Sequence, residues 1–152
     1  MKKIVIFLAL IFLNNCGFTP VYLSNENSVI NSIKSIGYNG NEILGKQIIR
    51  GLNLTIKDNN RFHLLIDSTK KRVTTSKNSS NVATGYMMSI DINLNILEND
   101  KIIVEKTFSK NFTYNNRDDK FELLNYERSI ENNLINDVTN EIYIFLNLTN
   151  DN

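Results

Sequence analysis

Hydrophobic and polar residues alternate most regularly in the stretch MSIDINLNI, residues 88–96. Every second position there is apolar, and each position between is serine, aspartate or asparagine. A period of two residues predicts a β-strand with one buried face and one polar face. The apolar set is Met88, Ile90, Ile92, Leu94 and Ile96, and the polar set is Ser89, Asp91, Asn93 and Asn95. Such patterning favours an antiparallel sheet.

Three further segments are predicted to be strands. The first, VINSIKSIGY over residues 29–38, is followed by the turn pair Asn39-Gly40. The second begins at Arg61 in RFHLLIDST, with Phe62, Leu64 and Ile66 on one face and His63 and Asp67 on the other. The third, residues 102–114, returns after a turn at residues 98–101 and completes a hairpin with residues 88–96. Its apolar face carries Val104, Phe108, Phe112 and Tyr114.

Two segments have the helical period instead. Leu44, Ile48 and Leu52 recur every four residues after Asn41, a residue suited to cap a helix N-terminus. A longer helix is predicted from about Asp119. Its apolar stripe comprises Leu123, Tyr126, Ile130, Leu134, Val138, Ile142 and Phe145.

The predicted order of elements is therefore β-α-β-β-β-α. The economical way to bury these apolar faces is an α+β two-layer sandwich, with one mostly antiparallel four-stranded sheet and both helices on one of its faces. No linker, repeat or long charge block divides the chain, so residues 29–148 are predicted to form a single domain, with residues 149–152 as a tail.

The N-terminus has a different pattern. Lys2 and Lys3 precede an unbroken apolar run over residues 4–13, which is typical of a secretory signal peptide and too short to span a bilayer. Cys16, the single cysteine, follows directly and resembles the cysteine of a bacterial lipobox, with Asn15 where a small residue is usual. We expect a lipoprotein signal peptide over residues 1–15 and a lipidated tether over residues 16–28. An uncleaved anchor or a buried free thiol is the alternative.

Charge gives no support for nucleic-acid binding. The 17 basic and 16 acidic residues give a net charge of +1, and cleavage before Cys16 would remove two lysines and bring it to about −1. The sequence has no nucleophile elbow, phosphate-binding loop or zinc-protease motif, and His63 is expected to be a surface or packing residue. We therefore expect no catalytic residue, no metal site and no cofactor.

Three consecutive basic residues are the remaining candidate site. Lys70, Lys71 and Arg72 follow the strand that begins at Arg61, and we expect them near a hairpin tip. Clustered cations there could bind the phosphates of a lipid head group, with arginine supplying two parallel hydrogen bonds. A turn that serves only solubility is the alternative, and the sequence favours it slightly.

The stretch CGFTPVY, residues 16–22, resembles the start of mature proteins of the LPS-assembly lipoprotein family LptE, also called RlpB. The order of elements also fits that family. The resemblance implies an outer-membrane lipoprotein, lipid-anchored through Cys16, that plugs the lumen of the β-barrel LptD, helps it fold and assists lipopolysaccharide transport to the outer leaflet. A free-standing periplasmic lipoprotein that binds a small ligand is the alternative. An envelope hydrolase is disfavoured, because no nucleophile-base pair is recognisable.

Overall fold

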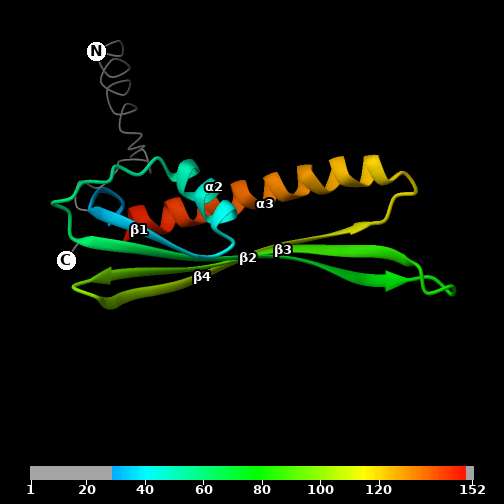
Figure 1. The fold of residues 1–152 in the computed structure, drawn as a ribbon, viewed down its shortest axis with the longest axis horizontal. Helices are drawn as coiled ribbons and strands as arrows, with labels where there is room; N and C mark the ends of the chain where they lie inside the picture. The colour runs from blue at the N-terminus through cyan, green and yellow to red at the C-terminus, as the bar shows by residue number, and fades with distance from the viewer. Residues whose placement is uncertain (1–28, 150–152) are drawn as a thin grey trace, which may run out of the picture.

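Two layers make up the protein in the computed structural model, which describes residues 29–149. The elements in chain order are η2 (Val29–Asn31), β1 (Ile33–Gly40), α2 (Glu42–Leu52), β2 (Phe62–Lys77), β3 (Ala83–Glu98), β4 (Lys101–Asn115) and α3 (Lys120–Leu148). The strands form one sheet in the order β1-β2-β3-β4. Both helices lie on the same face of it, and α3 extends along most of its length (Figure 1). The predicted α+β two-layer fold is confirmed.

The sheet is mixed. β2 pairs antiparallel with β3, and β3 pairs antiparallel with β4, whereas β1 pairs parallel with β2. The parallel pair follows from α2, which carries the chain back to the end of the sheet at which β1 began. The predicted first strand is shorter than expected, because Val29–Asn31 form a turn of 3₁₀-helix in which Val29 and Ile30 are buried.

The junction of β1 and α2 depends on two neighbouring residues. Gly40 has a φ of +67°, a left-handed conformation that glycine adopts without a steric penalty. The Asn41 side chain then accepts a hydrogen bond of 3.2 Å from the backbone N–H of Leu44 and caps α2, as predicted. The backbone N–H of Asn41 donates to Ser68 O over 2.7 Å, so this corner is tied to β2.

The core lies between the sheet and the helices and matches the predicted apolar faces of β2 and β3, whereas on β4 Phe112 is exposed and Val104 only partly buried. On β3, Ile90, Ile92 and Leu94 are fully buried, and on β2 so are Leu64 and Ile66. From the helices, the buried side chains are Leu44, Ile48, Leu52, Ile130, Leu134, Ile135, Val138, Ile142 and Leu146. Burial of this apolar surface is the main favourable contribution to folding.

The two central strands are longer than predicted, which changes the position of the basic residues. β2 continues to Lys77, and Arg72 pairs with Met88 in the middle of the β2–β3 ladder. The hairpin turn comes later, where Asn78 accepts hydrogen bonds of 3.0 Å from the backbone N–H groups of Ser80 and Val82. The expectation that Lys70, Lys71 and Arg72 lie near a hairpin tip is therefore wrong. Backbone pairing with β3 keeps this polar stretch extended, although it has no alternating apolar pattern.

Candidate functional site: a helix-facing cluster and an open sheet face

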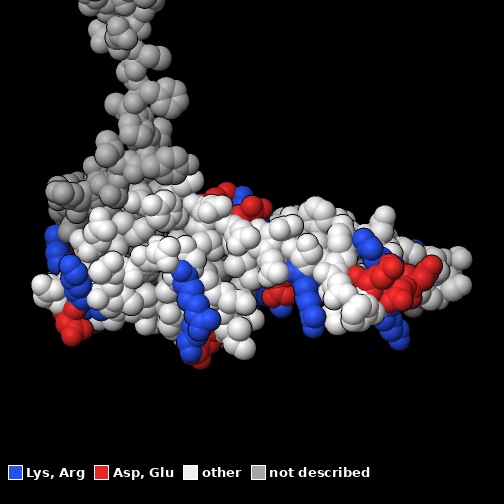
Figure 2. Space-filling model, turned by 90° about the horizontal axis from the view of Figure 1, so that it is seen from above, with Lys and Arg blue, Asp and Glu red and all other residues white. Residues whose placement is uncertain are grey.

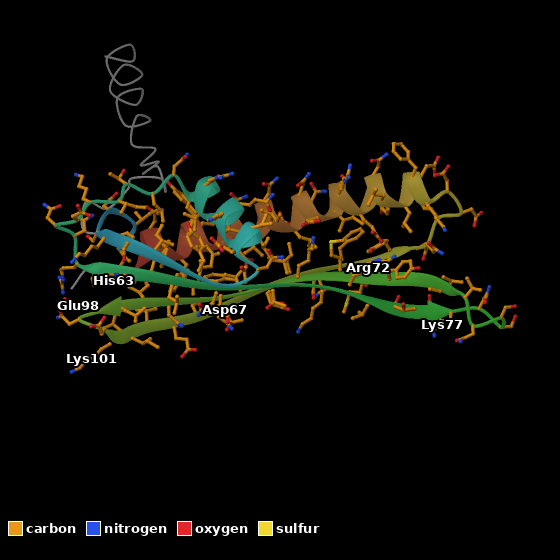
Figure 3. The ribbon with its side chains drawn as sticks, in the orientation of Figure 1. His63, Asp67, Arg72, Lys77, Glu98 and Lys101 are labelled. Atoms are coloured by element: carbon orange, nitrogen blue, oxygen red, sulfur yellow. The ribbon has the colours of Figure 1, made fainter. Side chains whose placement is uncertain are left out.

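The three candidate cations point to opposite faces of the sheet. Successive side chains of a strand alternate between the two faces. Lys70 and Arg72 therefore point toward α3, on the side of the core, and Lys71 points to the opposite face. Figure 3 shows Arg72 between the sheet and α3. The structure brings Lys70 and Arg72 together but separates Lys71 from both.

Each of the two helix-facing cations has a carboxylate partner on α3. Lys70 Nζ lies 2.7 Å from Glu131 Oε1, and Arg72 Nε lies 2.7 Å from Glu127 Oε1. Glu127 and Glu131 are four positions apart, so they occupy the same side of the helix. A cavity of about 310 Å³ lies beside these pairs, with Met88 and Arg128 also in its wall. Since its wall carries both signs of charge, this cavity is not a simple anion site.

Aromatic side chains complete the surroundings of Arg72. Its guanidinium carbon lies 3.7 Å from the centroid of the Tyr86 ring, an arrangement that favours a cation. The Tyr114 hydroxyl donates a hydrogen bond of 2.7 Å to Glu127 Oε1 and accepts one of 3.3 Å from Arg72 Nε. We call Arg72, Tyr86, Tyr114 and Glu127 the Arg72 cluster. It joins β2, β3, β4 and α3 at one place.

The cluster shifts the pKa of two of its members. Burial raises the pKa of Tyr114 to about 12, and the hydrogen bond to Glu127 adds to this effect. Burial also disfavours the charged form of Arg72, but the hydrogen bonds to Tyr114 and Glu127 outweigh it, so the pKa of Arg72 is raised. Tyr114 is thus a neutral donor, Arg72 a cation and Glu127 the shared acceptor at physiological pH. The arrangement fastens the first half of α3 to the sheet.

The opposite face of the sheet is open. No described helix lies on it (Figure 1), and Figure 3 shows Asp67 on this side. Its side chains on β3 and β4 bond to one another across the strands: Thr107 Oγ1 donates to Asn93 Oδ1 over 2.8 Å, and Ser109 Oγ donates to Asp91 Oδ1. Asp91 and Asn93 are polar positions predicted from the alternation in β3, and Thr107 and Ser109 are their partners on β4. They form a surface rich in hydroxyl and amide groups.

His63 also lies at this face. Its Nδ1 atom forms a hydrogen bond with Ser35 Oγ, which links β1 to β2. His63 is half-buried, in agreement with its expected role as a surface or packing residue. Within residues 29–149, no group of three or more His, Cys, Asp or Glu side chains lies close enough together to hold a metal ion.

The predicted lipid-attachment residue, Cys16, lies outside the described residues, as do the signal peptide, the whole of the tether and the end of the tail. The described chain begins beside the end of α3, where the Val29 N–H donates to Thr149 O over 3.1 Å. None of the helices in residues 29–149 is long and apolar enough to cross a membrane.

Charged side chains are dispersed over the helix layer. Figure 2, seen from above this layer, shows lysine and arginine in separate places with uncharged surface between them. The largest group of acidic side chains lies at the end where α3 begins. There Asp119 caps the helix by accepting hydrogen bonds of 2.7 Å and 3.0 Å from the N–H groups of Phe121 and Glu122. Negative charge is favourable at a helix N-terminus, so this group has a structural explanation.

Glu127 and Glu131 were not among the predicted site residues. The signal in the sequence is weak, since it consists only of two glutamates four positions apart on a helix that is polar on most sides. The spacing of Glu127 and Glu131 does not show which strand lies against their side of the helix. The tertiary structure alone pairs them with the cations of β2.

Solved structures of bacterial lipoproteins have the same fold. A lipoprotein from Caulobacter crescentus superposes with a TM-score of 0.57 at 15% identity, over 78% of this chain and 89% of that one. The minor lipoprotein of Acinetobacter baumannii has a TM-score of 0.58 at 14% identity, over 76% and 90%. Rare lipoprotein B of Shewanella oneidensis has a TM-score of 0.52 at 12% identity, over 69% and 88%.

The protein therefore has a fold found in bacterial lipoproteins. More particularly, its fold is that of rare lipoprotein B, and the expected likeness to the LptE (RlpB) family is confirmed for the fold. The sequence matches no family model and no curated protein.

Proposed function

We propose that the protein is an outer-membrane lipoprotein that occupies the lumen of an LptD-type β-barrel and assists the assembly of that barrel and the transport of lipopolysaccharide. The role is that of a non-enzymatic assembly factor. The fold shared with rare lipoprotein B supports it, as does the N-terminal stretch at residues 16–22.

The observation that carries the proposal is the open polar face of the sheet. A transmembrane barrel has a polar interior, because lipid-facing and lumen-facing residues alternate along its strands. Asp91, Asn93, Thr107 and Ser109 lie on two neighbouring strands and can exchange their mutual hydrogen bonds for bonds to a partner. A rigid sheet that presents such groups on one face and holds its helices on the other is suited to this contact.

Lipid anchoring at Cys16 is the second part of the proposal. Acyl chains on the new N-terminus would hold the protein at the outer membrane, with the domain facing the periplasm and the barrel lumen. Several chains are needed for this, because a single acyl chain binds a bilayer only marginally.

Lipopolysaccharide contact by Lys70, Lys71 and Arg72 is the third part, and the geometry divides it into two possibilities. Lys71 is exposed on the open face and can meet a phosphate directly. Lys70 and Arg72 are already paired with Glu131 and Glu127, so a phosphate there would compete with these carboxylates or bind to the remaining N–H donors of the two cations. Both contacts would be charge-assisted, and salt would weaken them.

Co-purification tests the proposed function. The full-length protein, tagged at its C-terminus and extracted from its own bacterium in mild detergent, should come out with a large outer-membrane β-barrel. Asn93→Lys should reduce that yield several-fold, whereas the same change at Asn132, exposed on α3, should not. A protein that comes out alone would favour the alternative, a free-standing periplasmic ligand-binding lipoprotein.

Lipopolysaccharide binding is measured separately. The variant with Lys70, Lys71 and Arg72 all changed to Gln should bind purified lipopolysaccharide more weakly at moderate salt and still co-purify with the barrel. Lys71→Gln alone, compared with the Lys70→Gln/Arg72→Gln pair, then shows which face makes the contact. Binding unchanged in all three variants would remove these residues from the proposal.

A further inference from the structure

An apolar groove runs along the outer edge of β4, beneath α3. β4 is the last strand of the sheet, and among residues 29–149 no strand pairs with its outer edge. Two hollows, of about 450 Å³ and 420 Å³, lie between β4 and α3. Lys110 lines one and Glu141 the other, and these two side chains form an ion pair from strand to helix.

The hollow nearer the end of α3 is the more apolar part of the groove. Phe108 and Phe145 pack edge to face there, with ring centroids 5.6 Å apart. Ile144 and Leu148 complete its wall and are 54% and 73% exposed. Phe112, predicted to lie on the apolar face of its strand, lines the neighbouring hollow and is 45% exposed. Adjoining apolar side chains beside a free strand edge mark a surface that another segment covers.

The position at which the described chain begins identifies that segment. The Val29 N–H is bonded to Thr149 O, so the preceding residues leave from the end of α3, next to Leu148. Five polar residues, 24–28, precede Val29, and before them residues 18–23 read Phe-Thr-Pro-Val-Tyr-Leu. Five extended residues span up to about 17 Å, which is enough for residue 23 to enter the groove.

The chemistry and direction of residues 18–23 also fit. Five of the six side chains are apolar or aromatic and would cost free energy if left in water. A segment that reaches the end of α3 from within the groove runs antiparallel to β4, a favourable arrangement for strand pairing. Pro20 lacks an N–H, which is tolerated in a strand at the edge of a sheet.

We propose that residues 18–23 bind in the groove between β4 and α3 as an extended edge strand, so that the chain's own N-terminal segment covers the free edge of its sheet. The first residue of the mature chain is then held near the domain rather than on a loose tether. This inference does not depend on the barrel or on lipopolysaccharide.

Paired cysteines in the full-length protein test the proposal in cell membranes. Val21→Cys combined with Ile144→Cys should form an intramolecular disulfide on mild oxidation, identified by the mass of the linked peptide. The control combines Val21→Cys with Tyr143→Cys. Tyr143 is the neighbouring residue on α3 but lines a hollow on the other side of that helix. Equal linkage of the two pairs, or linkage of neither, would overturn the proposal. A disulfide between two molecules would assign the groove to a second copy of the chain.

Amide hydrogen exchange provides a second measurement that needs no added cysteine. In the full-length Val21→Asp variant, amides of residues 106–109 on β4 should exchange at least tenfold faster than in the parent. Asn25→Asp, which adds the same charge in the polar part of the segment, should leave them unchanged. Equal exchange in the two variants would show that residues 18–23 do not cover β4.

Discussion

The Nε atom of Arg72, in the middle of β2, donates a hydrogen bond of 2.7 Å to Glu127, 55 positions later on α3. Tyr114 of β4 donates to the same carboxylate oxygen, and the Tyr86 ring lies against the guanidinium. One carboxylate therefore satisfies two donors from different strands. In a sheet that reaches well beyond α2, this contact holds the first half of the long helix in place (Figure 1).

Removing the shared acceptor should destabilise the protein. Glu127→Ala leaves the Arg72 and Tyr114 donors without that partner, so we expect a loss of about 1–3 kcal/mol in the free energy of unfolding. Glu131→Ala, one helical turn later, breaks only the pair with Lys70, in which the carboxylate is more exposed than that of Glu127, and should cost about 0–1 kcal/mol. Denaturant unfolding of both variants measures the difference. Equal losses would show that the Arg72 cluster contributes no more than an ordinary surface pair.

The Tyr114 hydroxyl should ionise at a higher pH than the hydroxyl of an ordinary tyrosine. Its pKa is raised to about 12 from 10.0, so the folded state favours the neutral form. The stability that this group contributes is therefore present below pH 10 and is lost as the pH rises toward 12. The difference in tyrosinate absorbance between the parent and Tyr114→Phe should rise only near pH 12. A difference that rises near pH 10 would contradict the predicted shift.

The buried face of β3 gives a prediction for core packing. Ile92 is fully buried, so Ile92→Ala should cost about 2–5 kcal/mol in the free energy of unfolding. Asn93, the next residue, points to the open face, and Asn93→Ala should cost no more than about 1 kcal/mol. Thermal or denaturant unfolding of the two variants makes the comparison. A loss below about 0.5 kcal/mol for Ile92→Ala would show that the wrong face has been placed inside.

Two glycines of β1 should differ in their tolerance of a methyl group. At Gly40 the φ is +67°, and an added Cβ would lie 2.4 Å from Ser68 O in the backbone. Gly40→Ala should therefore cost at least about 2 kcal/mol. At Gly37 the near atom, at 2.9 Å, is the end of the flexible Leu65 side chain, so Gly37→Ala should cost less. Equal melting temperatures for the two variants would contradict this difference.

Alternation was sufficient to identify the strand that organises the core. Each apolar position from Met88 to Ile96 is buried as predicted, because a period of two places all of them on one side of a strand whatever its neighbours are. In the predicted stripe of α3, Ile130, Leu134, Val138 and Ile142 are buried, whereas Leu123, Tyr126 and Phe145 are partly buried against the core. The apolar faces of the strands and helices were enough to predict two layers, with both helices on one face of the sheet.

The sequence by itself determined the buried faces of the central strands, the cap at Asn41, the start of the long helix near Asp119 and the order of the elements, because each depends on residues close together in the chain. The tertiary structure decided that β1 runs parallel to β2, since strand direction depends on how α2 crosses the sheet. It also decided where Lys70, Lys71 and Arg72 lie. Pairing with β3 extends β2 through Arg72. Lys70 therefore pairs with Glu131, and Arg72 pairs with Glu127. Lys71 points to the open face. Charges adjacent in sequence thus lie on opposite faces, because backbone hydrogen bonds to a distant strand, not local pattern, set the length of β2.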